Sequence, residues 1–318
     1  MPSIKSHKIS IIIPAYNCEA TIRNTLDSVF SQTYSPYEVI LVDDHSPVSV
    51  ASILNDDYPS VKIIRHSNNL GVQNARNTGF EQAVGDYILF LDADDVLYKN
   101  FLQSAAQTLT THPQIAAYFG NFVTIKSVDD HNAIPNESTQ KPNLKLLDQQ
   151  GGFSFYLANT GAFLPSFTVF RKTALDEVTI NGELFPKNVW GNEDFHLFLR
   201  ILSKFETAYE LNEMGLYLLQ PTSISQNQLK VWNSRVIAIN SLIEIFRDGP
   251  WNHEHLNLLK KLYSASLRVY ARILAAEGQK QKALKLLTKR ILVKPEIKTL
   301  ALIALILLNR NTRRATET

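Results

Sequence analysis

Residues 86–95 have the sequence D-Y-I-L-F-L-D-A-D-D, in which an apolar run is followed abruptly by Asp92, Asp94 and Asp95. The run has the length and composition of a buried strand. Its carboxyl end therefore brings three aspartates to the edge where open α/β sheets bind ligands. Neighbouring carboxylates repel one another unless a cation or hydrogen-bond donors lie among them. The stretch predicts a metal and ligand site.

Two alternatives compete with this interpretation. A calcium loop of the helix-loop-helix type needs a central glycine and a glutamate at its twelfth position, but counting from the first aspartate these places hold Leu97 and Gln103. An acidic helix N-terminus is the stronger alternative, because Asp94 or Asp95 could cap a helix that starts near Lys99. Capping by one aspartate does not explain the other two, so we favour a ligand site.

Length and composition limit the class of protein. A chain of 318 residues can form one large domain or two smaller ones. The net charge of +2, without a Lys/Arg block interleaved with aromatics, argues against a nucleic-acid partner. Cys18 is the single cysteine, which fits a reducing compartment. The apolar run 300–308 is less than half of the roughly 20 residues that a membrane-spanning helix needs. We therefore expect a cytoplasmic protein without a transmembrane segment.

Strands and helices alternate along the first hundred residues. The predicted strands cover residues 9–13, 38–42, 61–65 and 87–91. Helices are predicted between them, with Asn17 as the N-cap of the first. This alternation is typical of βαβ units and a parallel sheet. Because the crossovers are right-handed, the loops 14–17, 43–44 and 92–95 are expected to line one crevice.

The crevice is acidic rather than glycine-rich. The first predicted strand leads into P-A-Y-N and not into G-x-G-x-x-G, and the phosphate loop G-x-x-x-x-G-K-[ST] is absent from the sequence. A divalent cation held by carboxylates normally meets its substrate through phosphate oxygens. A nucleoside diphosphate compound therefore fits the site.

These motifs carry a resemblance to a known family. They are I-I-I-P-A-Y-N (11–17), V-D-D (42–44), N-L-G (69–71), A-R-N-T-G (75–79), L-D-A-D-D (91–95) and G-N-E-D (191–194). Over about residues 8–225 the chain resembles family-2 glycosyltransferases of the GT-A fold. The resemblance implies an inverting enzyme that moves a hexosyl or N-acetylhexosaminyl group from a nucleotide sugar, with a UDP-sugar as the expected donor class. It also implies a saccharide or lipid-linked acceptor and a role in cell-surface polysaccharide or glycolipid synthesis.

The resemblance assigns roles to individual residues. The nucleotide-sugar site is expected to comprise Pro14, Tyr16, Asn17, Asp44, Asn69, Arg76 and Asp92. The ligands of Mg²⁺ or Mn²⁺ are expected to be Asp94, Asp92 and Asp95. Asp194 matches the catalytic base, with Glu193 as its companion, and Trp190 is our candidate for the acceptor pocket. A carboxylate base suits the reaction, because a sugar hydroxyl is a poor nucleophile until its proton is removed.

Several of these residues also have purely structural explanations. Arg76 could fix the start of a helix, and Tyr16 could be a wall residue. Glu193 and Asp194 could be an acidic first helical turn. His45 replaces the glycine of most relatives, and histidine tolerates a positive φ better than most residues. Gln220 occupies a position at which members of the family commonly have arginine or histidine.

The predicted fold class is α/β: a GT-A domain, Rossmann-like, with a mostly parallel sheet flanked by helices, followed by an α-helical C-terminal extension. We place the GT-A domain at residues 1–227, with a nucleotide-sugar half at about 8–125 and an acceptor half at about 126–227. The polar stretch 129–150 predicts a loop, and the aromatic residues of 151–170 favour a core role. Residues 228–318 are expected to form a helical region.

The last predicted helix is apolar on every side over residues 300–308 and is followed by Arg310, Arg313 and Arg314. This combination suggests peripheral contact with the inner face of a membrane, or with a subunit, through the C-terminal helices. Burial within the helical bundle is the alternative that we favour.

Two other functions compete with glycosyl transfer. A non-catalytic nucleotide- or sugar-binding module would retain the crevice but would not need Asp194. A sugar-nucleotide pyrophosphorylase also needs an acidic metal site, but the glycine- and lysine-rich phosphate loop expected after its first strand is absent.

Overall fold

A computed structural model describes residues 7–127, 138, 141–219, 227–293 and 295–308. The chain forms two compact units. The first comprises residues 1–187 and 193–221, and the second comprises residues 188–192 and 222–318. Each unit is described by itself.

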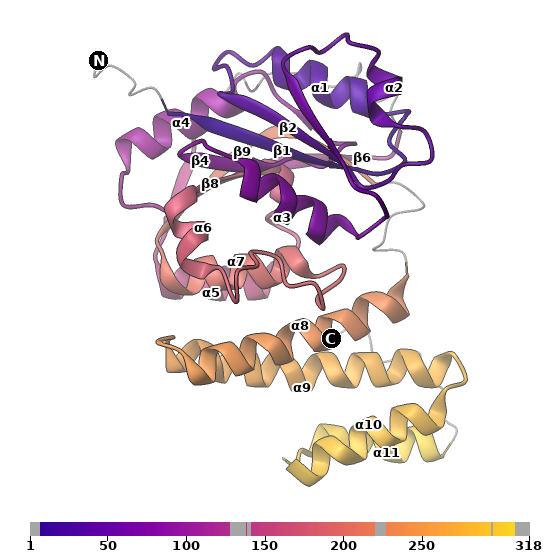
Figure 1. The fold of residues 1–318 in the computed structure, drawn as a ribbon. Coiled ribbons are helices and arrows are strands. Elements are labelled where there is room, and N and C mark those ends of the chain that lie inside the picture. The colour runs from indigo at the N-terminus through magenta and orange to yellow at the C-terminus, as the bar shows by residue number, and fades with distance from the viewer. Residues whose placement is uncertain (1–6, 128–137, 139–140, 220–226, 294, 309–318) are drawn as a thin grey trace. The chain divides into compact units, whose positions relative to one another are not determined.

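The first unit is built on one twisted sheet with helices on both sides (Figure 1). Within the described residues this sheet has nine strands: β1 (Ile9–Ala15), β2 (Glu38–Asp43), β3 (Val61–Arg65), β4 (Tyr87–Phe90), β5 (Val96–Leu97), β6 (Ala117–Ile125), β7 (Leu144–Leu147), β8 (Thr168–Arg171) and β9 (Thr207–Leu218). Their order is β3-β2-β1-β4-β8-β6-β9-β5, with β7 paired to β9. The neighbours among β1 to β4 are parallel, whereas β8 is antiparallel to both β4 and β6.

The strands predicted in the first hundred residues are confirmed to within two residues at each end. The helices of this unit are α1 (Ile22–Phe30), α2 (Val50–Leu54), α3 (Val72–Gln82), α4 (Phe101–Thr111), α5 (Gln149–Ala158), α6 (Lys172–Val178) and α7 (Glu193–Lys204), with the 3-10 turn η2 at Pro165–Phe167. The predicted N-cap was wrong. Thr21 is the N-cap of α1, and Asn17 lies four residues earlier with φ of 53°.

Both faces of the parallel strands are covered, which is why their sequences are continuously apolar. On one face, Ile11 and Ile13 pack in the same core cluster as Leu26 of α1. On the other, Ile12 faces α3 at Gly79, where an added Cβ would lie 2.2 Å from Ile12 Cγ2. Glycine at this position of the A-R-N-T-G motif therefore lets α3 lie close against β1.

The middle of the chain only partly matches its predicted loop. Residues 128–137 and 139–140 lie outside the described residues. In the remainder of the stretch, Leu144–Leu147 forms β7 and α5 begins at Gln149. The aromatic residues of 151–170 mostly pack in the core, as favoured. Phe155 is partly exposed, whereas the others are buried: Phe153, Tyr156, Phe163, Phe167 and Phe170.

Two polar residues are enclosed in α7. Arg200 is completely buried and donates hydrogen bonds to the carbonyl oxygens of Val178 and Leu184, which attaches the helix to the preceding segment. His196, one turn earlier, is also completely buried. Burial holds the pKa of His196 well below its usual 6.5, and the nearby Arg200 charge lowers it further.

Acidification should therefore destabilise the fold through His196. Below a pH of about 6.5 the unfolded chain protonates this ring and the folded chain does not, so the free energy of unfolding falls by about 1.4 kcal/mol per pH unit, whereas above that pH it is unaffected. Urea titrations at a series of pH values measure this slope. We expect His196→Gln to remove this contribution and His253→Gln, at an exposed position, to retain it. A parent slope unchanged by His196→Gln would contradict the assignment.

The second unit is helical, as predicted. Its helices are α8 (Gln228–Asp248), α9 (His253–Ala276), α10 (Lys280–Val293) and α11 (Ile297–Leu307). The favoured burial of residues 300–308 is confirmed for only one side of the helix. Leu302 and Ile306 are buried, but Leu300, Leu307 and Leu308 are exposed. Arg310, Arg313 and Arg314 lie outside the described residues. No described helix has both the length and the apolar character needed to cross a membrane.

Candidate active site

The loops that follow β1, β2 and β4 lie together, as the crossover rule predicts. The Asp44 N–H donates to the Ala15 carbonyl at 2.8 Å, which joins the ends of β1 and β2. The Leu91 N–H donates to the Ile12 carbonyl at 2.9 Å, which joins β4 to β1. These contacts place the segments 14–17, 43–44 and 92–95 at one edge of the sheet.

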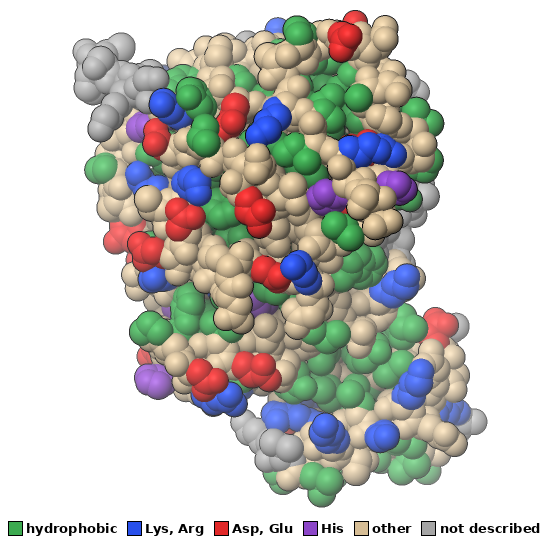
Figure 2. Space-filling view, viewed as in Figure 1, with side chains coloured by type: hydrophobic (Ala, Val, Ile, Leu, Met, Phe, Trp, Pro, Cys, Tyr) green, Lys and Arg blue, Asp and Glu red, His purple; other side chains and the backbone are tan. Residues whose placement is uncertain are grey.

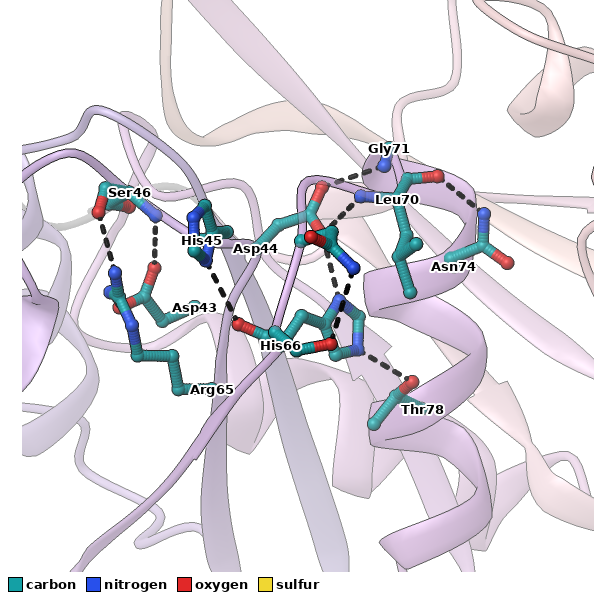
Figure 3. Close-up of polar contacts among 12 residues, drawn as sticks. Asp43, Asp44, His45, Ser46, Arg65, His66, Leu70, Gly71, Asn74 and Thr78 are labelled. Carbon is teal, nitrogen blue, oxygen red and sulfur yellow. Dashed lines mark hydrogen bonds and ion pairs between the residues drawn. The ribbon is translucent and has the colours of Figure 1, made fainter.

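Asp43 ends β2 and Asp44 directly follows it, and their side chains point to opposite sides of the chain, because successive residues of extended backbone alternate (Figure 3). The Asp43 carboxylate accepts hydrogen bonds from the N–H groups of Ser46 and Val50 and pairs with Arg65. Burial opposes its charge, but these donors keep the pKa of Asp43 below its usual value. Asp43 therefore shapes the turn after β2, in which His45 has the positive φ expected of the residue that replaces glycine, 63°.

The Asp44 carboxylate faces the start of α3 (Figure 3). It accepts hydrogen bonds from Leu70 N at 2.8 Å, from Gly71 N at 2.7 Å and from the His66 ring, whose Nδ1 lies 2.8 Å away. These three contacts use most of the roughly four lone-pair sites of a carboxylate. A nucleobase contact by Asp44 stays a prediction, and the observed arrangement makes Asp44 the anchor of the loop before α3.

No role was assigned to His66 from the sequence. The structure places its ring between Asp44 and Thr78, with Nε2 3.0 Å from Thr78 Oγ1 (Figure 3). His66 thereby connects β3 to α3. The signal in the sequence is its position directly after a strand, next to the edge where the other site residues gather.

The remaining nucleotide-site candidates differ in accessibility. Tyr16 is 53% exposed beside the strand ends, so its ring is accessible to an aromatic base. Asn17 and Asn69 are also exposed, whereas Pro14 is buried within β1. Their contacts with a nucleotide stay predictions.

The D-A-D-D loop is held at several points. The Ala93 carbonyl accepts a hydrogen bond from Thr21 Oγ1 at 2.8 Å, and the Asp92 N–H donates to Ser166 Oγ at 3.0 Å. The next helix, α4, begins at Phe101 with Asn100 as its N-cap, so neither Asp94 nor Asp95 caps it. The helix-cap alternative is therefore wrong, and another role is needed for these aspartates.

The three aspartates of this loop differ in environment. Asp92 and Asp94 are partly exposed, whereas Asp95 is 1% exposed and accepts a hydrogen bond from Leu218 N at 3.1 Å. Burial, reinforced by the charges of Asp94 and Asp92, raises the pKa of Asp95 well above its usual value. Its other oxygen, Oδ2, is buried without a hydrogen-bond partner among the described residues. Asp95 thus attaches the loop to β9.

Arg76 joins this loop to the start of α7. Its guanidinium is 4% exposed and lies 2.7 Å from Asp92 Oδ1 and 3.0 Å from Glu193 Oε1. Burial opposes the charge of Arg76, but Asp92 and Glu193 outweigh it and raise the pKa. The same bridge links residues 117 positions apart in the chain. The guanidinium is directed at carboxylates, which makes Arg76 a positioning residue of the acidic site.

Glu193 and Asp194 open α7 beside this bridge. Burial raises the pKa of Glu193, Arg76 opposes that shift, and the neighbouring Asp194 adds to it. Asp194 is partly exposed, and its Oδ1 accepts a hydrogen bond from the Phe195 N–H, with 2.7 Å between nitrogen and oxygen. Asp194 is thus an accessible carboxylate next to a buried one, the arrangement that a base needs in order to reach a substrate.

Trp190 belongs to the second unit, where the Lys230 ammonium lies 5.6 Å from its ring centroid. Its acceptor role stays a prediction. Sequence reasoning missed Tyr217 of β9. Burial raises the pKa of Tyr217 to about 12, with smaller contributions from Asp95, Asp92, Asp94 and Asp194. Tyr217 is therefore a phenol donor close to the acidic loop. Gln220 lies outside the described residues.

The residues present suit a magnesium or manganese ion that is shared with a substrate. No three His, Cys, Asp or Glu side chains of the described chain form a group that could hold a metal by themselves. Mg²⁺, however, is commonly bound by one or two carboxylates together with substrate phosphates. The partly exposed Asp92 and Asp94 provide such a hard-oxygen pair.

The sequence profile of glycosyl transferase family 2 matches residues 10–179, more than half of the chain. This chain belongs to glycosyltransferase family 2. An Escherichia coli relative, the UDP-Glc:alpha-D-GlcNAc-diphosphoundecaprenol beta-1,3-glucosyltransferase WfgD, is 30% identical over 240 residues, which is 74% of this chain and 87% of that protein. Family membership makes this protein a glycosyltransferase and favours transfer over the pyrophosphorylase reaction.

Solved structures support the GT-A fold of this glycosyltransferase. S. aureus TarS 1–349 in complex with UDP has a TM-score of 0.64 at 18% identity, and the match covers 93% of this chain and 83% of that one. The mannosyltransferase PcManGT from Pyrobaculum calidifontis, solved with GDP-Man and Mn²⁺, has a TM-score of 0.59 at 18% identity, over 94% of this chain and 79% of that one. At these identities the likeness concerns the fold.

Proposed function

We propose that this glycosyltransferase moves a hexosyl or N-acetylhexosaminyl group from a UDP-sugar to a hydroxyl of a lipid-linked saccharide, with inversion at the anomeric carbon. One observation carries the proposal. Arg76 brings the D-A-D-D loop and the Glu193–Asp194 pair together, although they are far apart in the sequence. A site with carboxylates from two separate elements suits a direct displacement, in which leaving group and base act on opposite sides of one carbon.

Asp194 is the proposed general base. As the acceptor oxygen forms its bond to the anomeric carbon, the hydroxyl proton passes to the Asp194 carboxylate and the bond to the diphosphate oxygen breaks. The leaving UDP takes the electron pair of that bond. Glu193, buried against Arg76, keeps the start of α7 in place during the reaction.

Asp92 and Asp94 are the proposed ligands of Mg²⁺ or Mn²⁺, and Asp95 holds their loop against β9. The bound cation would neutralise the negative charge that develops on the diphosphate. Pro14, Tyr16, Asn17, Asp44 and Asn69 are proposed to form or support the nucleotide site at the ends of β1 and β2. Arg76 fixes the orientation of Asp92 rather than contacting the nucleotide directly.

The names of two similar proteins support the proposed acceptor and donor classes. WfgD is named for a diphosphoundecaprenol-linked acceptor, and TarS was solved with UDP. We therefore propose a lipid-linked saccharide acceptor, a place in cell-surface polysaccharide synthesis, and action from the cytoplasm at the inner face of the membrane.

Calorimetric titration of UDP, GDP, dTDP and CDP, with and without Mn²⁺, tests the donor site. We expect UDP to bind in a metal-dependent manner, and we expect Asp94→Ala to lose that binding because a ligand of the cation is removed. Asp86→Ala is the matched control, since Asp86 is exposed at the opposite end of β4. Equal UDP binding by the parent and Asp94→Ala would overturn the metal assignment, and no binding of any nucleotide would overturn the donor site.

A further inference from the structure

The helix α11 has two apolar faces and buries only one of them. Thr299, Leu302 and Ile306, spaced three and four residues apart, are buried on the inner face. The outer face carries Ile297, Ala301, Ala304 and Leu308, flanked by Leu300, Leu305 and Leu307, and all seven are exposed. Ile297 is 86% and Leu307 is 65% exposed. Lys298 is the one charged residue of α11.

The preceding helix, α10, contacts α11 and carries positive charge. Lys282, Lys285 and Lys289 of α10 are spaced three and four residues apart, so they share one helical face, and all three are exposed. The same face ends at Leu292, which is 81% exposed. Figure 2 shows basic and hydrophobic side chains interspersed over the region of α10 and α11. We call these lysines and Leu292, together with the outer face of α11, the α10–α11 surface.

The surface has almost no negative charge to balance its lysines. Residues 280–308 contain seven Lys or Arg and a single acidic residue, Glu296. That carboxylate is already paired, with Arg268 at 2.6 Å and with Arg290 at 3.2 Å. The exposed lysines therefore give this surface a net positive charge.

We propose that the α10–α11 surface binds a membrane with anionic headgroups, with its lysines at the phosphates and the outer face of α11 in the interfacial zone. Charge complementarity selects this occupant. The helix is about 16 Å long, too short to span the roughly 30 Å hydrocarbon core but sufficient to lie in its interface. The inference deepens the membrane location given under the proposed function by naming the surface that makes contact, but its test does not depend on the transfer reaction, since this surface needs neither donor nor acceptor.

Two other occupants fit the same surface less well. A second copy of the chain would bring identical lysines against these ones, and like charges repel across an interface. Residues 309–318 of the same chain have the sequence N-R-N-T-R-R-A-T-E-T, in which Ala315 is the one apolar residue. That segment offers too little apolar surface to cover the six exposed leucine and isoleucine side chains of the α10–α11 surface.

Co-sedimentation with vesicles tests the proposal without any substrate. We expect the full chain to bind phosphatidylcholine vesicles that contain phosphatidylglycerol about tenfold or more tightly than pure phosphatidylcholine vesicles, and added salt to weaken that binding. Lys285→Glu with Lys289→Glu should weaken it about tenfold or more, while Lys260→Glu with Lys261→Glu makes the same charge change at exposed positions of α9 and should not.

A second double variant, with a matched control, tests the apolar part of the surface. Leu300→Ser with Leu307→Ser should also weaken vesicle binding about tenfold or more, whereas Val84→Ser with Leu146→Ser, at exposed positions of the first unit, should leave it unchanged. Circular dichroism confirms that each variant is folded. Equal binding to both kinds of vesicle, or parent-like binding by either surface variant, would overturn the proposal. The proposal would also be overturned if analytical sedimentation showed that the parent is an oligomer and that the surface variants are monomers, because the surface would then bind a second copy of the chain.

Discussion

We expect Asp194→Asn to lower the turnover number by about 10²- to 10⁴-fold, the usual contribution of a positioned general base. Asparagine preserves the shape of the side chain and its contact with the Phe195 N–H, but it cannot accept the hydroxyl proton. Because Asp194 is not among the proposed metal or nucleotide ligands, the affinity for UDP should be unchanged. The measurement is UDP release from UDP-glucose with α-D-GlcNAc-diphosphoundecaprenol as acceptor, the substrates in the name of WfgD.

A matched control for this experiment lies in the same unit. Asp176→Asn makes the same chemical change on α6, where the side chain is 54% exposed and pairs with Lys172. We expect it to retain the parent rate. If Asp194→Asn turned over like the parent, the assigned base would be wrong. If the parent bound UDP but transferred no sugar to any tested acceptor, the non-catalytic binding module would become the better description.

The second large effect is expected at Arg76. Arg76→Ala removes the shared partner of Asp92 and Glu193 and leaves Glu193 buried without its cation. Breaking a buried ion pair in this way costs about 3–5 kcal/mol in the free energy of unfolding. Urea titration at neutral pH measures the loss. We also expect transfer to fail, because the acidic loop and the start of α7 are no longer connected.

An exposed ion pair provides the comparison. Arg23 lies 2.6 Å from Asp57 with both side chains about half exposed, so Arg23→Ala should cost less than about 1 kcal/mol. Arg76→Lys separates charge from geometry, since lysine keeps the charge but lacks the planar fork that reaches two carboxylates. We expect it to unfold at an intermediate urea concentration and to transfer sugar more slowly than the parent. A loss at Arg76→Ala no larger than at Arg23→Ala would contradict a structural bridge.

Much of the fold followed from local sequence patterns. The apolar runs before Pro14, Asp43 and Asp92 became β1, β2 and β4, because their length and continuity require burial on both faces of a parallel sheet. The positive φ of His45 was also expected, from the residue type that usually occupies its position. The antiparallel strand β8 was not expected, because strand direction beyond the βαβ units depends on connections that periodicity does not describe.

The roles of the polar residues were harder to predict. Asn17 was expected to cap a helix, but Thr21 occupies that place because the chain needs a further turn after β1 before α1 begins. Asp44 was expected to face a ligand, and three donors of the protein surround it. His66 and Tyr217 had no assigned role, because nothing in their immediate sequence shows which distant groups they meet.

By itself, the sequence determined the alternation of strands and helices, the family, and the edge of the sheet at which the acidic motifs gather. Those properties depend on periodicity and on the handedness of crossovers, which act over short stretches of chain. Only the tertiary structure decided that Arg76 bridges Asp92 to Glu193, that Asp95 is buried while Asp92 and Asp94 are partly exposed, and that α11 leaves one apolar face open. The partner and exposure of a side chain depend on segments that folding brings together from distant parts of the sequence.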